Sequence, residues 1–233
     1  MQHYPSQRTS HQAHSHRYSQ SRPHGYAAQP PAGSAYPPPQ MHHRPSQSSS
    51  HGQPPSSVPD RARLWQWFQQ VDTDRSMEIS ANELQAALVN GEWSRFDIDT
   101  VKMLMNMFDV DRSGTIGFNE FEGLWKYITD WQRVFKHFDR DQSGTIDGHE
   151  LAAALQSFGY NLSPGLMALV EQKYAPAPPG GYGPKPGITF DRFVRACVMV
   201  RTLTEAFRQK DTDGDGLIYV NYEEFMTMVF SAP

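Results

Sequence analysis

Two twelve-residue segments of this 233-residue chain, 109–120 and 139–150, place oxygen-bearing side chains at the spacing that a Ca²⁺ ion requires. Each has Asp, Asp and Ser at positions 1, 3 and 5, Gly at position 6, Ile at position 8 and Glu at position 12. Position 7 contributes its backbone carbonyl, and the glutamate closes the coordination shell with both carboxylate oxygens. The spacing predicts two calcium sites, with the ligands Asp109, Asp111, Ser113, Thr115 and Glu120, and Asp139, Asp141, Ser143, Thr145 and Glu150.

An earlier segment, 72–83, keeps the same ligand positions but has Met77 where the turn favours glycine. Forcing an ordinary residue into a left-handed conformation costs about 1–2 kcal/mol. A cost of that size lowers affinity about tenfold. We therefore predict a weakened calcium site with the ligands Asp72, Asp74, Ser76, Glu78 and Glu83.

Two later segments depart further from the pattern. When Ile188 is aligned with position 8, position 12 is Arg192, a cation that predicts no calcium binding there. The segment that begins at Asp211 starts well, but its glutamate, Glu224, comes two residues late. Weak or absent binding is expected at this last loop, whose candidate ligands are Asp211, Asp213, Asp215 and Leu217.

The position-8 residue of all five segments is isoleucine, a β-branched residue that suits a short strand. We expect the first such strand to pair with the second and the third with the fourth. The fifth then has no partner within the chain, and an exposed strand edge favours pairing with another copy. The odd number of segments therefore predicts a dimer. The five residues are Ile79, Ile116, Ile146, Ile188 and Ile218.

The segments between the loops carry apolar residues at helical spacing. Residues 119–138 and 191–210 each form one uninterrupted apolar stripe that connects two loops. Each of these ranges is therefore predicted to be a single helix shared by two neighbouring units. The expected fold is all-α, with five helix-loop-helix units and short paired β-strands.

Composition divides the chain near residue 59. Residues 1–59 contain no Asp, Glu or Lys and are rich in Ser, Pro, Gln and His, which predicts a disordered leader. The remainder, 60–233, holds 17 of the 21 Lys and Arg residues against all 25 Asp and Glu, a formal charge of about −8. This balance suits a calcium-binding domain and argues against nucleic acid as a partner.

Other features narrow the class of protein. The single cysteine, Cys197, lies in an apolar helical run and is expected to be a buried thiol in a reducing compartment. No apolar run of 18 residues and no signal-peptide pattern is present, so we expect a cytoplasmic protein that is neither secreted nor transmembrane. No catalytic triad, phosphate-binding loop or paired catalytic carboxylates occur, and no enzymatic activity is expected.

Residues 60–233 resemble the penta-EF-hand family in their five EF-hand units, shared helices, decayed fourth loop and lengthened fifth loop. The segments 118–131 and 158–163 are similar to stretches typical of that family. The resemblance implies dimers through the fifth hand and Ca²⁺-triggered exposure of apolar surface. It also implies that Trp125 and Tyr222 match aromatic residues near a groove for Pro-rich peptides. The chain departs from its relatives at Met77, where they have glycine.

The predicted function is a cytoplasmic Ca²⁺ sensor and adaptor that dimerises through its fifth hand. When calcium is bound, it would bind target proteins, including Pro-rich ones, or associate peripherally with membranes. One alternative is a structural regulatory subunit that stabilises a catalytic chain in a heterodimer, and another is a passive Ca²⁺ buffer. Whether the partner in the dimer is a second copy or a different penta-EF-hand chain stays open at this stage.

Overall fold

The computed structural model describes residues 61–230, except 92, 177–179, 181–182 and 184–185. The predicted disordered leader, 1–59, lies outside the described residues. Eight helices occur in the described part of the chain, and none of them is both long and apolar enough to cross a membrane. They are α1 (Arg61–Val71), α2 (Ala81–Ala87), α3 (Ile98–Phe108), α4 (Phe118–Phe138), α5 (Gly148–Ser157), α6 (Pro164–Tyr174), α7 (Phe190–Lys210) and α8 (Tyr222–Phe230).

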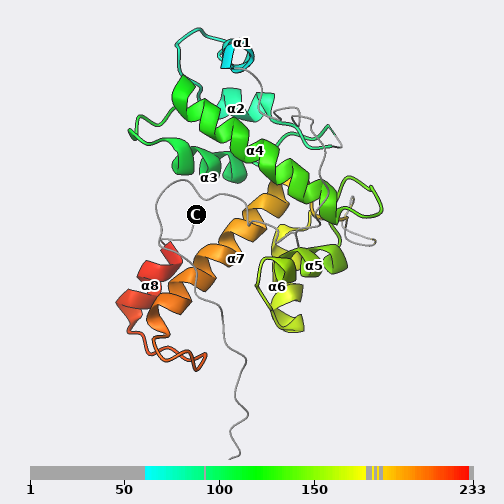
Figure 1. Ribbon diagram of the computed structural model, residues 1–233, viewed down its shortest axis with the longest axis vertical. Helices are drawn as coiled ribbons and strands as arrows, with labels where there is room; N and C mark the ends of the chain where they lie inside the picture. Colours follow the sequence, from blue (N-terminus) through cyan, green and yellow to red (C-terminus); the bar gives the residue numbers. More distant parts are fainter. Residues whose placement is uncertain (1–60, 92, 177–179, 181–182, 184–185, 231–233) are drawn as a thin grey trace, which may run out of the picture. The chain divides into compact units, whose positions relative to one another are not determined.

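These helices form five helix-loop-helix units because α4 and α7 each belong to two of them (Figure 1). The units are α1–α2, α3–α4, α4–α5, α6–α7 and α7–α8. Both predicted shared helices are confirmed, and each begins one residue earlier than the apolar pattern indicated, at Phe118 and Phe190. The all-α fold class is confirmed for the described residues.

The hydrophobic core draws residues from helices α1 to α7, and part of it lies between α4 and α7. Trp131 and Phe135 of α4 pack edge-on against Phe193 of α7, with ring centroids 5.9 and 5.6 Å apart. Aromatic rings in this geometry bury a large apolar area and add a favourable quadrupole interaction. Cys197, one turn further along α7, is buried as expected, and burial raises the pKa of its thiol.

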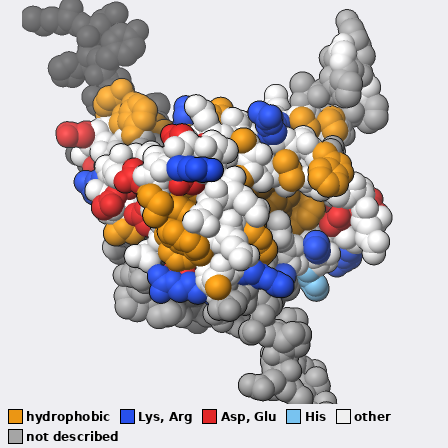
Figure 2. All heavy atoms as spheres, turned by 90° about the horizontal axis from the view of Figure 1, so that it is seen from above, with side chains coloured by type: hydrophobic (Ala, Val, Ile, Leu, Met, Phe, Trp, Pro, Cys, Tyr) orange, Lys and Arg blue, Asp and Glu red, His pale blue; other side chains and the backbone are white. Residues whose placement is uncertain are grey.

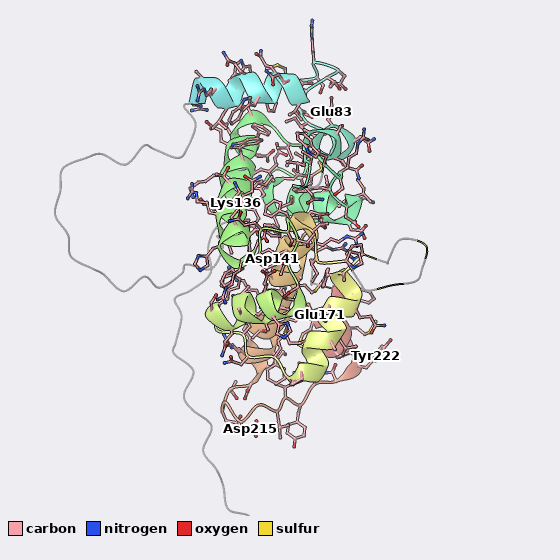
Figure 3. All side chains as sticks on the ribbon, turned by 90° about the vertical axis from the view of Figure 1, so that its right-hand side faces the viewer. Glu83, Lys136, Asp141, Glu171, Asp215 and Tyr222 are labelled. Carbon is pink, nitrogen blue, oxygen red and sulfur yellow. The ribbon has the colours of Figure 1, made fainter. Side chains whose placement is uncertain are left out.

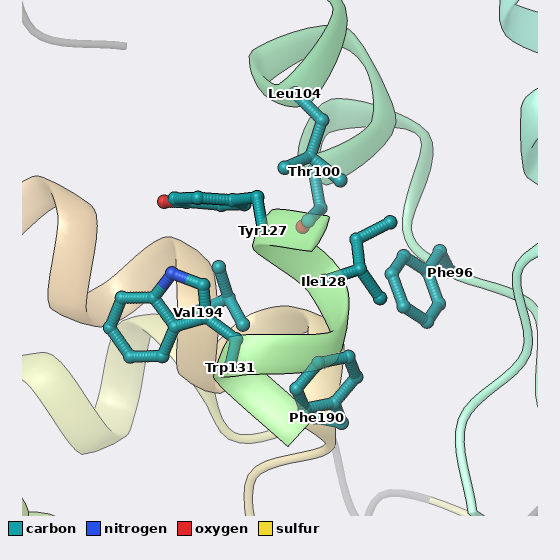
Figure 4. A pocket seen from close by; sticks show the side chains of 8 residues that line it. All are labelled: Phe96, Thr100, Leu104, Tyr127, Ile128, Trp131, Phe190 and Val194. Atoms are coloured by element: carbon teal, nitrogen blue, oxygen red, sulfur yellow. The ribbon is translucent and has the colours of Figure 1, made fainter. Parts of the chain in front are cut away.

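A cavity of about 10 Å³ lies between α3, α4 and α7 (Figure 4). Its volume suffices for no more than about one water molecule. Three lining residues carry a buried polar atom without a hydrogen-bond partner among the described residues, namely Thr100, Tyr127 and Trp131, and the other lining residues are apolar. The cavity is too small for an organic ligand.

The predicted β-strands are reduced to single residue pairs in the described part of the chain. Ile79 pairs with Ile116 through two backbone hydrogen bonds of 2.9 Å, and Ile146 pairs with Ile188 through two of 2.8 Å. The pairing partners are those predicted, and each pairing is a single-residue bridge and not a longer strand. The physical reason is that position 9 already caps the next helix, so only position 8 is free to pair.

A buried carboxylate ties the fourth unit to the first two. Asp191, in the first turn of α7, is 1% exposed and accepts hydrogen bonds from the Thr189 hydroxyl and from the Asp97 backbone N–H, the latter at 2.7 Å. The Asp191 backbone N–H in turn donates to the side-chain oxygen of Asn90 at 3.1 Å. Since Asp97 caps α3, this carboxylate fixes the start of α3 against α7.

We expect Asp191→Ala to lower the free energy of unfolding by about 2–3 kcal/mol, because it leaves buried donors without an acceptor. Asp99→Ala is the matched control: its side chain is 58% exposed and pairs with Arg195 at 3.2 Å. That change should cost less than about 1 kcal/mol. Chemical denaturation in a chelating buffer measures both values, and similar losses for the two variants would show that Asp191 does not hold these units together.

Candidate calcium-binding loops

Four loops gather three carboxylate-bearing residues each, with one oxygen from each residue within 4.8 Å of the others. Glu83, Asp141 and Asp215 mark three of these loops in Figure 3. Three of the groups contain the residues predicted at positions 1, 3 and 12, and the fourth contains positions 1, 3 and 5. The groups are Asp72, Asp74 and Glu83; Asp109, Asp111 and Glu120; Asp139, Asp141 and Glu150; and Asp211, Asp213 and Asp215.

Backbone hydrogen bonds hold the carboxylates at positions 1 and 3 of the first three loops in place. In the second loop Asp109 accepts from the backbone N–H groups of Ser113 and Gly114 at 2.9 and 2.8 Å, and Asp111 accepts from that of Ser113 at 3.0 Å. The same pattern recurs in the first and third loops. The loops therefore already have the turn that directs several oxygens to one point, which suits a hard divalent cation.

In the second and third loops, the glutamate at position 12 accepts hydrogen bonds from both ends of the loop. Glu120 accepts the backbone N–H of Val110, at position 2, at 2.8 Å and that of Gly117, at position 9, at 2.8 Å. Glu150 does the same with Arg140 and Asp147, at 2.8 and 3.1 Å. Because this residue is also the third residue of the exit helix, one carboxylate closes the loop and completes the helix cap.

Hydrogen bonds lower the pKa of one carboxyl group in each of the first three loops, namely Glu83, Asp111 and Asp141, and so favour its charged form. Hydrogen bonds from Ser80 and Thr73 lower the pKa of Glu83 to about 2, from an ordinary value of 4.5. Hydrogen bonds from Ser113 lower the pKa of Asp111, and those from Ser143 lower the pKa of Asp141. The stability that Glu83 contributes is present above about pH 4.5 and is lost as the pH falls toward about 2. At neutral pH the loops are ready to bind a cation.

The left-handed backbone predicted at Met77 is confirmed, with φ of +69°. Gly114 and Gly144 occupy the same position in the next two loops with φ of +83° and +79°. Position 4 is also left-handed in the first three loops, a feature that the sequence reasoning missed. Its occupants are Arg75, Arg112 and Gln142. No sequence signal marks them, since glycine fills position 4 only in the fifth loop, at Gly214.

The fifth loop differs at its closing residue. Glu224 accepts the backbone N–H of Asn221 at 3.1 Å and caps α8, but its other oxygen pairs with Lys210 at 2.8 Å. In the second and third loops, the second carboxylate oxygen of the glutamate instead accepts a hydrogen bond from the backbone N–H of position 2. Glu224 is accordingly absent from the acidic group of this loop. Lys210, which directly precedes the loop, was the sequence signal for this difference, and the reasoning from spacing did not use it.

The fourth unit directs its position-12 cation away from its own loop. Arg192 pairs with Asp97 at 3.3 Å, at the start of α3. Its loop contains several residues outside the described part of the chain. Ile188, at position 8 of this loop, still pairs with Ile146 of the third loop. The unit thus supports its neighbour through the backbone while its charged side chain fastens α7 to α3.

The two aromatic residues expected near a peptide groove lie in different settings. Trp125 is half-buried and packs against Trp67 of α1, with ring centroids 4.7 Å apart, and against Phe121. Tyr222 is 78% exposed at the start of α8. No ring contact, hydrogen bond or cavity joins the two among the described residues, so a shared groove stays a prediction.

The helix-loop-helix geometry and the acidic loops define an EF-hand protein, and comparison with known proteins agrees. The EF-hand domain pair family matches residues 61–126 and 128–230. Human peflin is 43% identical over 180 residues, which cover 77% of this chain and 61% of peflin. Sorcin from Schistosoma japonicum is 44% identical over 174 residues, covering 75% of this chain and 98% of that sorcin.

A solved structure shares the fold as well. The homolog of programmed cell death 6 protein from Leishmania major Friedlin has a TM-score of 0.60 and 30% sequence identity, with 73% of this chain and 94% of that chain covered. The matched region spans less than two thirds of the length of the peflins from human, Xenopus laevis and Danio rerio. This chain belongs to the penta-EF-hand family of calcium-binding proteins, whose members are regulators, and Ca²⁺ is its cofactor.

We expect Met77→Gly to strengthen Ca²⁺ binding at the first loop by up to about tenfold, because glycine adopts the left-handed turn without a Cβ penalty. The reciprocal variant, Gly114→Met, should weaken the second loop by a similar factor. A Cβ at Gly114 meets no atom within 4 Å, so the Cβ itself does not clash and the left-handed backbone is the main cost at this position. Calcium titration by calorimetry measures both changes, and unchanged affinities in both variants would contradict the explanation.

Proposed function

We propose that this protein is a calcium sensor and adaptor whose EF-hand domain comprises residues 60–233. The second and third loops are its principal calcium sites, with the ligands predicted from their spacing. The first loop binds more weakly because of Met77, and the fifth weakly or not at all because Glu224 faces Lys210. The hydrogen bonds by which Glu83, Glu120 and Glu150 join both ends of their loops support placing all three loops above the fifth.

The observation that carries the proposal is the uncovered apolar face of the fifth hand. No residue of α8 is buried, and Ile218 forms no bridge with any described residue. Exposed apolar side chains of this size on one short helix and its loop mark an interaction surface. They are Leu217, Tyr219, Tyr222, Phe225, Val229 and Phe230, which are between 45% and 98% exposed.

A second penta-EF-hand chain is the proposed occupant of this face. An identical or related fifth hand offers both an unpaired position-8 residue and a matching apolar helix, so the two surfaces complement each other in a two-fold arrangement. Either a copy of this chain or a related chain fits this chemistry. In both cases the dimer covers α8, while the first three loops stay free to bind Ca²⁺.

Shared helices provide the route from ion binding to target binding. When Ca²⁺ draws in Glu120 and Glu150, the starts of α4 and α5 move with these side chains, since each is the third residue of its helix. Helix α4 packs on α1 and α7, and its movement changes the apolar surface at both contacts. The face drawn in Figure 2 carries hydrophobic patches beside Lys and Arg side chains, and such surface suits protein targets or an anionic membrane.

A Ca²⁺ titration of the full chain, read with a dye that fluoresces on apolar surface, tests the sensor. We expect a saturable rise at about 10⁻⁷–10⁻⁵ M Ca²⁺ and none with Mg²⁺. Glu120→Gln should reduce the rise, whereas Glu122→Gln, two residues along α4 and paired with Arg61, should not. Bound calcium without a change in fluorescence would contradict exposure and favour the structural subunit or the buffer.

Phe225→Glu tests the dimer, because it places a charge on the exposed face of α8, where Phe225 is 51% exposed. We expect light scattering to show a loss of the dimer, with helix content unchanged. Leu169→Glu on α6 is the matched control, since Leu169 is 60% exposed on another helix. A dimer that survives Phe225→Glu but not Leu169→Glu would place the interface on α6 instead.

A further inference from the structure

A side-chain hydrogen bond connects the first and second loops in addition to their backbone bridge. The Thr115 hydroxyl, at position 7 of the second loop, donates to the Glu78 carboxylate, at position 7 of the first loop, at 2.6 Å. Both residues directly precede the bridged isoleucines, so their side chains lie together on the other face of that bridge. The Glu78 backbone carbonyl remains a candidate ligand of its own loop, where it accepts from the Ser76 hydroxyl at 2.8 Å.

The Thr115 hydroxyl also contacts a candidate ligand of the second loop. Thr115 Oγ1 lies 3.1 Å from Ser113 Oγ, which is the candidate ligand at position 5. A threonine hydroxyl has one proton, and here that proton is donated to Glu78. The contact between the two hydroxyls can then form only with Ser113 as the donor. The Ser113 hydroxyl also lies 3.3 Å from the Thr115 carbonyl oxygen and 3.5 Å from Asp109 Oδ1, so the Thr115 hydroxyl is the nearest of its three acceptors. When the Ser113 proton is donated to Thr115 it is not donated to Asp109, and the oxygen lone pairs stay available to a cation.

The third loop contains the same two hydroxyls without the carboxylate. Ser143 Oγ and Thr145 Oγ1 are 3.2 Å apart, and either can donate to the other. The residue facing Thr145 is Gly187 of the fourth unit, where a Cβ would collide with Thr145 Oγ1. No side chain from that residue can therefore set the direction of the Thr145 proton. The chain thus offers an internal comparison between a loop that has the carboxylate and one that lacks it.

We propose that Glu78 of the first loop is a positioning residue for Ca²⁺ binding at the second loop, acting through Thr115 on Ser113. The carboxylate orders the two hydroxyl dipoles before the ion arrives, and its negative charge further favours a cation nearby. Calcium affinity of the second loop then depends on a side chain of the first, whether or not the first loop holds an ion. This inference rests on the proposed assignment of the second loop as a calcium site.

The test is a Ca²⁺ titration of the isotope-labelled full chain followed by NMR. The Gly114 and Gly144 amides donate to the first aspartates of the second and third loops, so their resonances report the two loops separately. Glu78→Gln and Thr115→Val should each raise the half-saturation of Gly114 about threefold to tenfold. The double variant should be no weaker than the weaker single one, and Thr115→Ser should bind like the parent.

Two controls separate this role from a general loss of structure. The Gly144 half-saturation should stay within about twofold of the parent in all these variants, because the substituted residues belong to the first and second loops. In chelator, Glu78→Gln should shift the Thr115 amide resonance while leaving those of Ile79 and Ile116 protected from exchange.

Two results would overturn the proposal. If Gly114 titrates identically in the parent and in Glu78→Gln, or if the effects of Glu78→Gln and Thr115→Val simply add, Glu78 does not act through Thr115. In either case the assignment of the second loop as a calcium site survives. If the Gly114 resonance of the parent does not respond to Ca²⁺ at all, both the assignment and this inference fail.

Discussion

The structure depends on the carboxylate at position 12 of the first three loops, which has two functions in each of them. A helix start leaves backbone N–H groups without partners, and a calcium loop needs a bidentate acceptor at its end. Glu83, Glu120 and Glu150 meet both needs, since each caps its exit helix and reaches back to the second residue of its loop. Any movement of this side chain toward an ion is therefore also a movement of a helix.

The fourth and fifth units show what happens when that carboxylate is missing or engaged elsewhere. Arg192 fastens α7 to Asp97, and Glu224 pairs with Lys210 at the end of α7. Both units keep their helices and packing without a closed loop. Their side chains instead form ion pairs at the two ends of α7, and no residue of α8 is buried. Within one chain, the same helix-loop-helix fold therefore provides some units whose loops suit ion binding and others whose side chains make contacts with neighbouring elements.

Neighbouring loops are connected by the pairing of their isoleucines. The bridge between Ile79 and Ile116 is short because a helix cap begins at the next residue, so few backbone groups are free to connect the loops. The hydrogen bond from Thr115 to Glu78 adds a second connection on the opposite face of the bridge. The third and fourth loops pair through the backbone in the same way but have Gly187 at the matching position.

Local spacing in the sequence determined the loops, the two shared helices and the left-handed turn at Met77, because each depends on residues close together in the chain. The recurrence of isoleucine at position 8 also predicted which isoleucines pair, although the paired residues are distant in the chain. Only the tertiary structure decided where Arg192, Asp191 and Glu224 direct their side chains and that Thr115 meets Glu78. It also reduced the predicted strands to single bridges. These outcomes depend on contacts between residues distant in the chain or on competition for the same backbone groups, and spacing alone does not encode either.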